Sequence, residues 1–398
     1  WFYIFILPPG LSLSTIAMSD DSIIHWQEID GEKSARWRSE KGLPAPKRVQ
    51  VIDDRMPADT AYRLACEGTA LLWRGDFQNA RQLLHAMARR ADKIKPGKPK
   101  QSAASPAEAF HRHRLAQSQR ARVLEKLLIP FNADHSIPLR RAPDVHAACV
   151  EADDSYTEPY VASLRELLGL IGAHEWRKKG IRIPALDVAI HPHYGVFAPI
   201  RNEYVQLIAQ APIPELLATK STAFDIGTGT GVLAAALALQ GIRHIIATDQ
   251  DARALNCARD NLTRLNMLDR VELVQTDLFP QGQAALIVCN PPWIPAHPSS
   301  PLEHAIFDPD SRMLRGFLQG LSAHLLPGGE GWLILSDFAE HLGLRTREEL
   351  LAAIDAANLK VLGKSDVKPH HPRVSDTSDP LHTARNAELT SLWRLATQ

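Results

Sequence analysis

Short apolar runs alternate with amphipathic segments along the second half of the chain, from Ser221 onward. Such alternation predicts an α/β fold in which a doubly wound, mostly parallel sheet has helices on both faces. Seven strands are expected, at residues 222–226, 244–248, 271–276, 285–289, 331–336, 359–363 and 389–395. The pattern indicates no helix between the last two, so we expect them to form a closing antiparallel hairpin.

Helical spacing dominates the first half of the chain instead. Residues 18–57 are polar and weakly periodic, which predicts a loosely structured lead-in. Residues 59–91 have apolar positions at helical spacing, and Gly75 and Asp76 interrupt them as a stop and an N-cap, so a helical hairpin is expected. Further helices are expected over 107–128 and 145–178.

These patterns divide the chain into residues 1–17, 18–180 and 181–398. The apolar run that opens the first part is far shorter than the roughly 20 residues that span a bilayer, and no basic segment precedes it. Because Met18 opens an ordinary polar segment, we expect residues 1–17 to be a non-native or disordered extension, with a signal-anchor fragment as the alternative. Residues 18–180 are expected to form a mostly helical domain with a basic loop at 93–106, and residues 181–398 to form the α/β domain.

Charge is balanced over the whole chain but not along it. The 398 residues include 45 basic and 45 acidic side chains, so no global field attracts nucleic acid or a membrane. Between Arg81 and Arg122, however, eleven Lys or Arg residues face only two acids. This basic segment is either a surface for RNA or a ribosomal partner, or a solvated helix face and linker. The four cysteines are widely spaced, which predicts reduced thiols, a cytoplasmic protein and no metal site.

A glycine-rich turn follows the first expected strand: Asp225-Ile-Gly227-Thr228-Gly229-Thr-Gly231. Glycines let the backbone approach a ligand closely, and the N-terminus of the next helix favours an anionic group. The turn also matches a dinucleotide-binding pattern, with Asp249 about twenty residues beyond it. A nicotinamide-dependent oxidoreductase is therefore one alternative.

Three acids help to distinguish a dinucleotide from another ligand of this turn. Asp225 would repel a pyrophosphate but attract an ammonium group. Asp249 ends the second strand, where it suits two ribose hydroxyls, and Asp277 with Leu278 ends the third, where they suit an adenine amine and ring. Together they describe a site for an adenosine that carries an amino acid.

This series, followed by Asn290-Pro291-Pro292-Trp293 after the fourth strand, resembles class I S-adenosylmethionine-dependent methyltransferases of the methyltransferase-small-domain, HemK-like group. The resemblance covers only the last 200 or so residues and implies a Rossmann-like fold with S-adenosyl-L-methionine as cofactor. It implies that Asp225 and the backbone from Gly227 to Gly231 hold the methionine moiety, Asp249 the ribose and Asp277 the adenine.

The motif from Asn290 to Trp293 stands at the carboxyl end of a strand, where open α/β sheets bind ligands. A conjugated nitrogen is a poor nucleophile, so it needs acceptors that orient its N–H groups. The Asn290 side-chain oxygen and the Pro291 carbonyl are suited to this, Pro292 stiffens the loop, and Trp293 offers a flat face for stacking. The alternative is a simple turn after a strand. We therefore predict methylation of a planar nitrogen with no metal involved.

Other residues are weaker candidates. The segment from Tyr194 to Tyr204 precedes an apolar helix, and in related enzymes such a segment folds over the cofactor pocket, which makes Phe197 and Pro199 candidates beside a plain packing role. Four histidines are expected to be loop or solvent-exposed residues rather than catalytic bases, since methyl transfer requires none: His297, His304, His370 and His371.

Two acceptors fit the motif. Release-factor glutamine methyltransferases of the HemK type have Asn-Pro-Pro-Tyr, and ribosomal or transfer RNA base methyltransferases have Asn-Pro-Pro-aromatic. Trp293 departs from the first pattern, and the N-terminal half is about twice as long as the corresponding region of HemK enzymes. The acceptor is therefore either a nucleobase amine, extruded from its stack, or a glutamine amide of a ribosomal or translation-factor protein. A cofactor-binding protein without activity is a further alternative.

Overall fold

The computed structural model describes residues 23–92, 103–152, 155, 157–298, 303, 305–369, 376–377 and 379–398. Two compact units are present. The first unit comprises residues 1–102 and 112–175, and the second unit comprises residues 103–111 and 176–398. The expected extension at 1–17, residues 93–102 of the expected basic loop, and His304, His370 and His371 lie outside the described residues.

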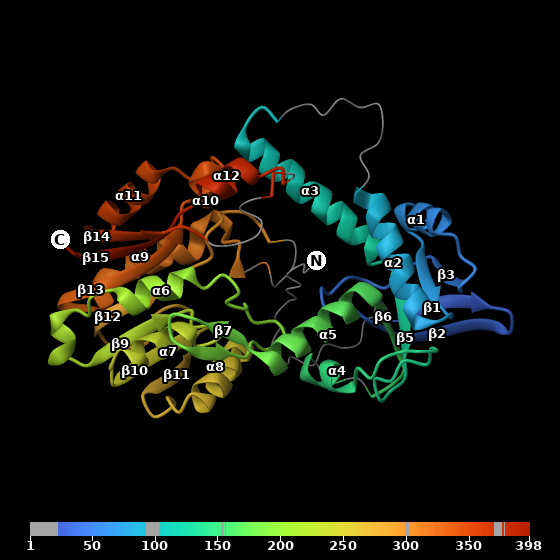
Figure 1. The fold of residues 1–398 in the computed structure, drawn as a ribbon, viewed down its shortest axis with the longest axis horizontal. Helices are drawn as coiled ribbons and strands as arrows, with labels where there is room; N and C mark the ends of the chain where they lie inside the picture. The colour runs from blue at the N-terminus through green and yellow to red at the C-terminus, as the bar shows by residue number, and fades with distance from the viewer. Residues whose placement is uncertain are drawn as a thin grey trace. The chain divides into compact units, whose positions relative to one another are not determined.

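The second unit contains the predicted seven-stranded sheet (Figure 1), with the strand order β11-β10-β9-β12-β13-β15-β14. The strands are β9 (Thr222–Ile226), β10 (His244–Asp249), β11 (Val271–Gln275), β12 (Ala284–Cys289), β13 (Leu325–Ser336), β14 (Leu359–Val367) and β15 (Thr390–Thr397). The first five in chain order are parallel, and β15 is antiparallel to both β13 and β14. The α/β fold and its antiparallel closure are thus confirmed. The connection between β14 and β15, expected to lack a helix, contains the short helix α12 (His382–Ala387).

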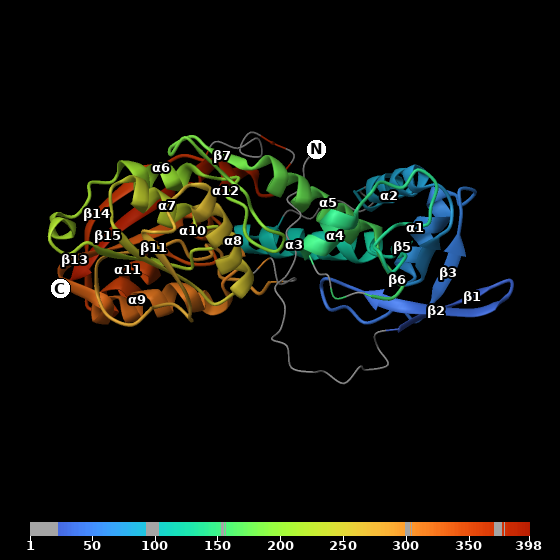
Figure 2. The same cartoon turned by 90° about the horizontal axis from the view of Figure 1, so that it is seen from below.

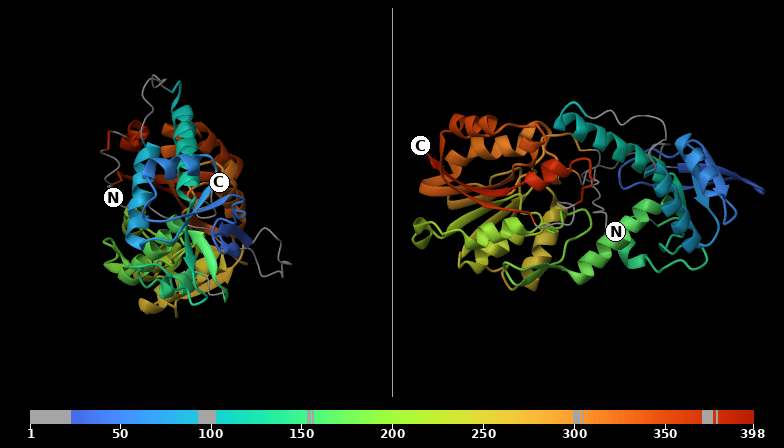
Figure 3. Two further views of the ribbon diagram at one scale, coloured as in Figure 1. Left: turned by 90° about the vertical axis from the view of Figure 1, so that its right-hand side faces the viewer. Right: turned by 45° about the horizontal axis from the view of Figure 1, so that its top comes forward.

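Helices cover both faces of this sheet, as Figure 1 and the right panel of Figure 3 show. One face packs against α6 (Glu203–Gln210), α7 (Val232–Leu239) and α8 (Ala252–Arg264). The other packs against α9 (Arg312–His324) and α11 (Arg347–Ala356). Helix α7 is rich in alanine and is buried over residues 232–238. Its small side chains allow it to lie close to both the sheet and α6. The unit also holds α10 (Phe338–His341) and a small sheet of β7 (Ile181–Ile183) and β8 (Val188–Ile190).

The ends of four strands meet at one edge of the sheet. Ile226 of β9 is paired in register with Thr248 of β10 on one side and Cys289 of β12 on the other, and Asp249 is paired with Gln275 of β11. From β9 the sheet continues to β10 on one side and from β12 to β13 on the other, so the strand order reverses between β9 and β12. Open α/β sheets bind ligands at such a point.

The first unit contains a sheet that the sequence patterns did not predict. Its strand order is β1-β2-β6-β5-β4-β3. The strands are β1 (Ile23–Glu28), β2 (Gly31–Arg38), β3 (Val49–Ile52), β4 (Ala70–Trp73), β5 (Leu127–Phe131) and β6 (Tyr160–Ser163). The expectation of a loose lead-in over 18–57 was wrong, because three of these strands lie there. In β1 only Ile24 and Trp26 are buried, which leaves too short an alternation to stand out.

The predicted helices of the first unit are present but shorter than expected (Figure 2). They are α1 (Ala58–Cys66), α2 (Phe77–Asp92), α3 (Pro106–Leu124), which begins in the second unit, α4 (His146–Ala152) and α5 (Leu164–Lys179). Strands β4 and β6 lie within stretches that were assigned to helices, and β5 overlaps the end of a third such stretch. Every residue of these strands is buried, and a wholly buried strand of four or five residues shows neither the helical nor the strand period. None of the described helices is long and apolar enough to cross a membrane.

Candidate active site

The turn between β9 and α7 depends on its glycines. Gly227 and Gly231 have φ values of 73° and 80°, a region that L side chains rarely adopt. A Cβ atom on Gly227 would lie 2.6 Å from the Met313 methyl group, and one on Gly231 would lie 3.2 Å from Ala258. The turn is therefore closed in by α9 on one side and α8 on the other. Gly229, with nothing within 4 Å of the corresponding position, is the glycine with open space beside it.

Asp225 organises this turn from a fully buried position at the end of β9. Its Oδ2 accepts hydrogen bonds from the Thr228 hydroxyl at 2.6 Å and from the Ala234 N–H at 3.0 Å. Its Oδ1 is buried without a hydrogen-bond partner among the described residues. Burial raises the pKa of Asp225 to about 6. An unsatisfied buried carboxylate oxygen is costly, and a cationic donor such as an ammonium group would satisfy it.

Asp249 connects the ends of β9 and β10. Its Oδ2 accepts the Gly229 N–H at 3.0 Å, and its Oδ1 accepts the Asp251 N–H at 3.0 Å. Burial raises its pKa. Each carboxylate oxygen can accept a second hydrogen bond, so Asp249 can hold the turn and also accept two ligand hydroxyls.

Asp277 and Leu278, which lie shortly after β11, have different surroundings. The Leu278 carbonyl accepts the Thr248 hydroxyl at 2.6 Å, which fixes Leu278 to the end of β10 with a φ of 70°. The Asp277 carboxylate is instead paired with Arg312 at the start of α9, at 2.5 Å, and both side chains are more than half exposed. A pair this exposed is weak, so a ligand can displace Arg312 from Asp277 at little cost.

The motif after β12 has an internal hydrogen bond. The Trp293 indole N–H donates to Asn290 Oδ1 at 2.8 Å. The Arg201 guanidinium lies over the Trp293 ring, 5.1 Å from its centroid, and Tyr204 meets the ring edge-on at 6.5 Å. The indole is half-buried and packs against apolar clusters from both sides of the sheet.

The weaker candidates lie close to this region or away from it. In the segment around Phe197, Val196 is buried against Ala254 and Cys257 of α8, so the segment packs beside the helix that follows Asp249. Phe197 is half-buried, Pro199 is buried, and His297 is exposed.

Sequence reasoning did not identify Arg201, Glu388 or Asp308 as part of this region. Asp308 accepts the Met313 and Leu314 N–H groups at 3.0 and 3.1 Å and so begins α9 beside the turn. Arg201 lies within the segment from Tyr194 to Tyr204 that was expected to cover the cofactor pocket, so the sequence already pointed to its neighbourhood. Its partner Glu388 is 187 residues away, and no local pattern connects the two.

Metal and thiol chemistry have no visible centre in the described part of the chain. No group of three or more His, Cys, Asp or Glu side chains in it is placed to hold a metal ion. The four cysteines are free thiols, and three of them are buried.

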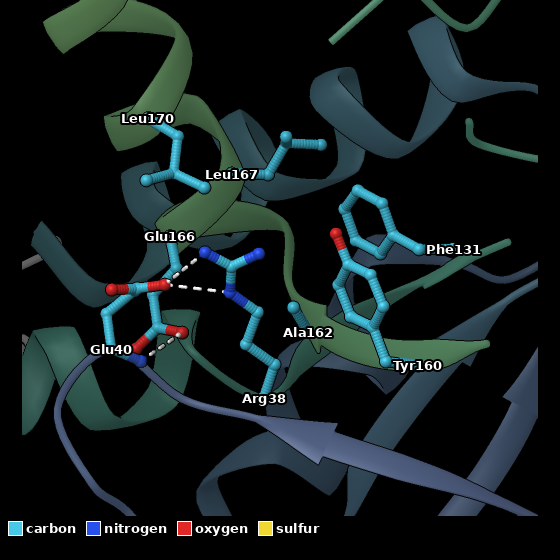
Figure 4. Close-up of a pocket in the computed structure, with 8 residues that line it drawn as sticks. All are labelled: Arg38, Glu40, Phe131, Tyr160, Ala162, Glu166, Leu167 and Leu170. Atoms are coloured by element: carbon cyan, nitrogen blue, oxygen red, sulfur yellow. Dashed lines mark hydrogen bonds and ion pairs between the residues drawn. The ribbon is translucent and has the colours of Figure 1, made fainter. Parts of the chain in front are cut away.

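A small cavity also lies in the first unit, apart from these strand ends (Figure 4). Arg38 crosses it, bonded to Glu40 at 2.8 Å, and Glu166, Tyr160 and Phe131 form other parts of its wall. Burial, together with the nearby charges of Glu125 and Glu40, raises the pKa of Glu166 to about 7. This cluster holds no residue of the predicted site.

Comparison with known families gives an independent assignment for the second unit. Residues 187–346 match the model of the methyltransferase small domain. A release factor glutamine methyltransferase of Cereibacter sphaeroides is 36% identical over 123 residues, which cover 27% of this chain and 44% of that protein. A ribosomal protein L11 methyltransferase of Clostridium perfringens is 26% identical over 168 residues, which cover 37% of this chain and 49% of that protein. The chain thus spans about half the length of the curated relatives it matches, or less.

Solved structures overlap with the chain only partly. A methyltransferase from Pyrococcus furiosus has a TM-score of 0.37 at 18% identity and covers 57% of this chain and 98% of its own. The ribosomal protein L11 methylase of Lactobacillus delbrueckii subsp. bulgaricus has a TM-score of 0.33 at 17% identity, with coverages of 50% and 79%. The match of residues 187–346 confirms the resemblance to the methyltransferase-small-domain group, whereas the roles given to Asn290 and the three acids stay predictions.

Proposed function

We propose that the chain transfers a methyl group from S-adenosylmethionine to a planar nitrogen, since residues 187–346 match the methyltransferase small domain. The convergence of four strand ends carries this proposal. Asp225 and Asp249 lie at the carboxyl ends of β9 and β10, and Leu278 and Asn290 lie beyond the ends of β11 and β12, where these neighbouring strands end together at the switch point of the sheet.

The residues at this edge fit the cofactor. The Asp225 Oδ1, which has no partner among the described residues, suits its ammonium group. Gly229, the glycine of the turn with open space beside it, leaves room for its methionine part, and the remaining lone pairs of Asp249 suit the ribose hydroxyls. Leu278 suits one face of the adenine, and Asp277 suits its amine once Arg312 moves aside. When bound, the cofactor supplies an electrophilic methyl group on a sulfonium.

Asn290 and Pro291 would act on the acceptor nitrogen. Asn290 Oδ1 and the Pro291 carbonyl accept its N–H hydrogens, which favours a pyramidal nitrogen with its lone pair directed at the methyl carbon. Fixing reactants in such a near-attack geometry can contribute about 7–11 kcal/mol to lowering a barrier. The same fixed oxygens stabilise positive charge that develops on the nitrogen, so neither a metal nor a separate base is needed.

Hydride transfer explains the site less well. A dinucleotide would bring its pyrophosphate to the β9 turn, where the buried Asp225 carboxylate would repel it. The family match and the Asn-Pro-Pro-Trp loop also have no role in a nicotinamide-dependent oxidoreductase. A binding protein without activity would have no use for an acceptor loop beside the cofactor turn.

The acceptor is either a nucleobase amine or a glutamine amide. The curated relatives named above act on a release factor and on a ribosomal protein, which supports a protein of the translation apparatus. Trp293 and the basic segment between Arg81 and Arg122 support RNA. Either acceptor occurs in the cytoplasm, where we place the protein.

Transfer of a tritiated methyl group tests the proposal. The full chain is incubated with methyl-tritiated S-adenosylmethionine and cell lysate, and the products are treated with nuclease or protease before gel analysis. Protease-sensitive label identifies a protein acceptor, and nuclease-sensitive label identifies RNA. The Asn290→Ala variant should retain cofactor affinity by calorimetry and transfer no label. Wild-type protein that binds no cofactor, or a variant with full activity, would contradict the proposal.

A further inference from the structure

The hydrogen bond between Trp293 and Asn290 fixes how the asparagine amide is oriented. An indole N–H is a donor only, whereas an asparagine side chain presents an acceptor oxygen and a donor NH₂ group that differ by a flip. The 2.8 Å contact from Trp293 Nε1 is therefore compatible only with the Asn290 oxygen. The oxygen keeps a second lone pair, which can accept a hydrogen bond from an N–H of the nitrogen that is methylated.

An unfixed amide would work against the reaction. If the Asn290 side chain flipped, its NH₂ group would point at the N–H of the acceptor, and two donors would face each other. The indole prevents this from within the same loop. A tyrosine could not replace it, because its hydroxyl is at the far tip of the ring and a phenol has no donor where the indole nitrogen lies.

The Trp293 ring is itself held from outside the loop. The Arg201 guanidinium lies over its face, and Arg201 is fixed by Glu203 at 2.7 Å and Glu388 at 3.0 Å. Glu388 also accepts the Ser336 hydroxyl at 2.6 Å, at the end of β13. Both carboxylates are nearly buried. With two carboxylates on one guanidinium, Arg201 is not placed to attract an anionic substrate; it also donates to the Thr390 hydroxyl at 3.4 Å and lies over the indole.

We propose that Trp293 and Arg201 are positioning residues that hold the Asn290 amide with its oxygen available to the acceptor nitrogen. This inference rests on the proposed function. It gives the tryptophan of the motif a task other than stacking. It also connects the acceptor loop after β12 to the ends of β13 and β15, on the antiparallel side of the sheet.

Enzyme kinetics distinguish a positioning role of Trp293 from a stacking role. Trp293→Phe keeps an aromatic face but removes the donor, and Arg201→Gln removes the cation above the ring. The full-length variants are assayed with tritiated cofactor and with total RNA or total protein from cell lysate, whichever the wild type labels. We expect Trp293→Phe to lower kcat about 10- to 100-fold while the apparent KM for that fraction stays within about twofold. Trp176→Phe, at an exposed position of the second unit, should match the wild type. An unchanged kcat, or a change confined to KM, would overturn the inference.

Nuclear magnetic resonance tests the orientation without any turnover. In the full chain labelled with ¹⁵N-tryptophan, the Trp293 indole resonance is the one that disappears in Trp293→Phe. Its solvent exchange should be slow in the wild type and at least about tenfold faster in Asn290→Ala and in Arg201→Gln. Equal exchange rates in all three proteins would overturn the inference, whereas a wild type that labels nothing but shows protected exchange would contradict only the proposed function.

Discussion

At the scale of single residues, Asp225 combines a structural and a ligand-binding role in one carboxylate. One oxygen closes the β9 turn through Thr228 and Ala234, and the other is buried with no partner among the described residues. The pKa of Asp225 is raised from 3.8 to about 6 by burial. The stability that the protonated form provides is therefore fully present below pH 3.8 and is lost as the pH rises through about 6.

The same shift predicts a pH dependence of cofactor binding. An ammonium group binds the ionised carboxylate, so cofactor affinity should rise between pH 5 and pH 7 and level off above it. Asp225→Asn should bind the cofactor more weakly at pH 7 and lose the dependence. Calorimetric titrations at pH 5, 6 and 7 measure this. A wild-type affinity that is flat across the range would show that no cation meets this carboxylate.

Asp249 gives a second prediction at this scale. Asp249→Ala removes both the acceptors for the ribose and the bonds to Gly229 and Asp251, so we expect cofactor affinity to fall below detection by calorimetry. Asp269→Ala, at an exposed aspartate of the same unit, serves as the control and should bind as the wild type does. Unchanged affinity in Asp249→Ala would refute the ribose assignment, and thermal denaturation checks that each variant is folded.

At the scale of elements, the sequence predicted the second sheet better than the first. The strands of the second unit lie between glycine-rich turns and amphipathic helices, so their limits are marked on both sides. Strands β4, β5 and β6 follow helical segments closely and are buried at every position, which hides them within an apparent helix. The site residues were predictable because they lie at or shortly after the carboxyl ends of strands, whereas the Arg201–Glu388 pair depends on two segments that only the fold brings together.

The end of β6 gives a prediction about stability. Glu166 lies in the first turn of α5 beside Glu40, Glu125, Lys41 and Arg38, and only 4% of it is exposed. Its pKa is raised from 4.5 to about 7. Its contribution to stability is therefore fully present below pH 4.5 and is lost as the pH rises through about 7, which amounts to at most about 3 kcal/mol.

Glu166→Gln imitates the protonated form at every pH. The variant should melt at a higher temperature than the wild type at pH 8 and show little difference at pH 5, as measured by circular dichroism. Because all other titrating groups are shared, the difference between the two proteins isolates this carboxyl group. A difference that stays the same at both pH values would mean that Glu166 does not titrate in this range.

At the scale of the whole molecule, the chemistry and the basic segment belong to different parts of the chain. The residues that match the methyltransferase small domain lie in the second unit, whereas all eleven basic residues between Arg81 and Arg122 lie in the first. Some of these charges are already paired within the first unit: Arg90 with Asp59 and Arg120 with Asp92. Arg81, Arg89 and Arg122 are exposed and remain the best candidates for phosphate contacts.

Removing these three charges decides whether the basic segment serves an RNA acceptor. Each lysine or arginine on a phosphate adds about one unit to the slope of log affinity against log salt. The Arg81→Ala, Arg89→Ala, Arg122→Ala triple variant should therefore bind total RNA with a slope reduced by about three, while its cofactor affinity stays unchanged. The matched control is Arg243→Ala, Arg259→Ala, Arg264→Ala, which removes the same charge from exposed positions of the second unit. Equal reductions of the salt slope in both triple variants would indicate non-specific attraction. An unchanged slope in the first variant would mean that the basic segment is a solvated surface without bound phosphates, which favours a protein acceptor.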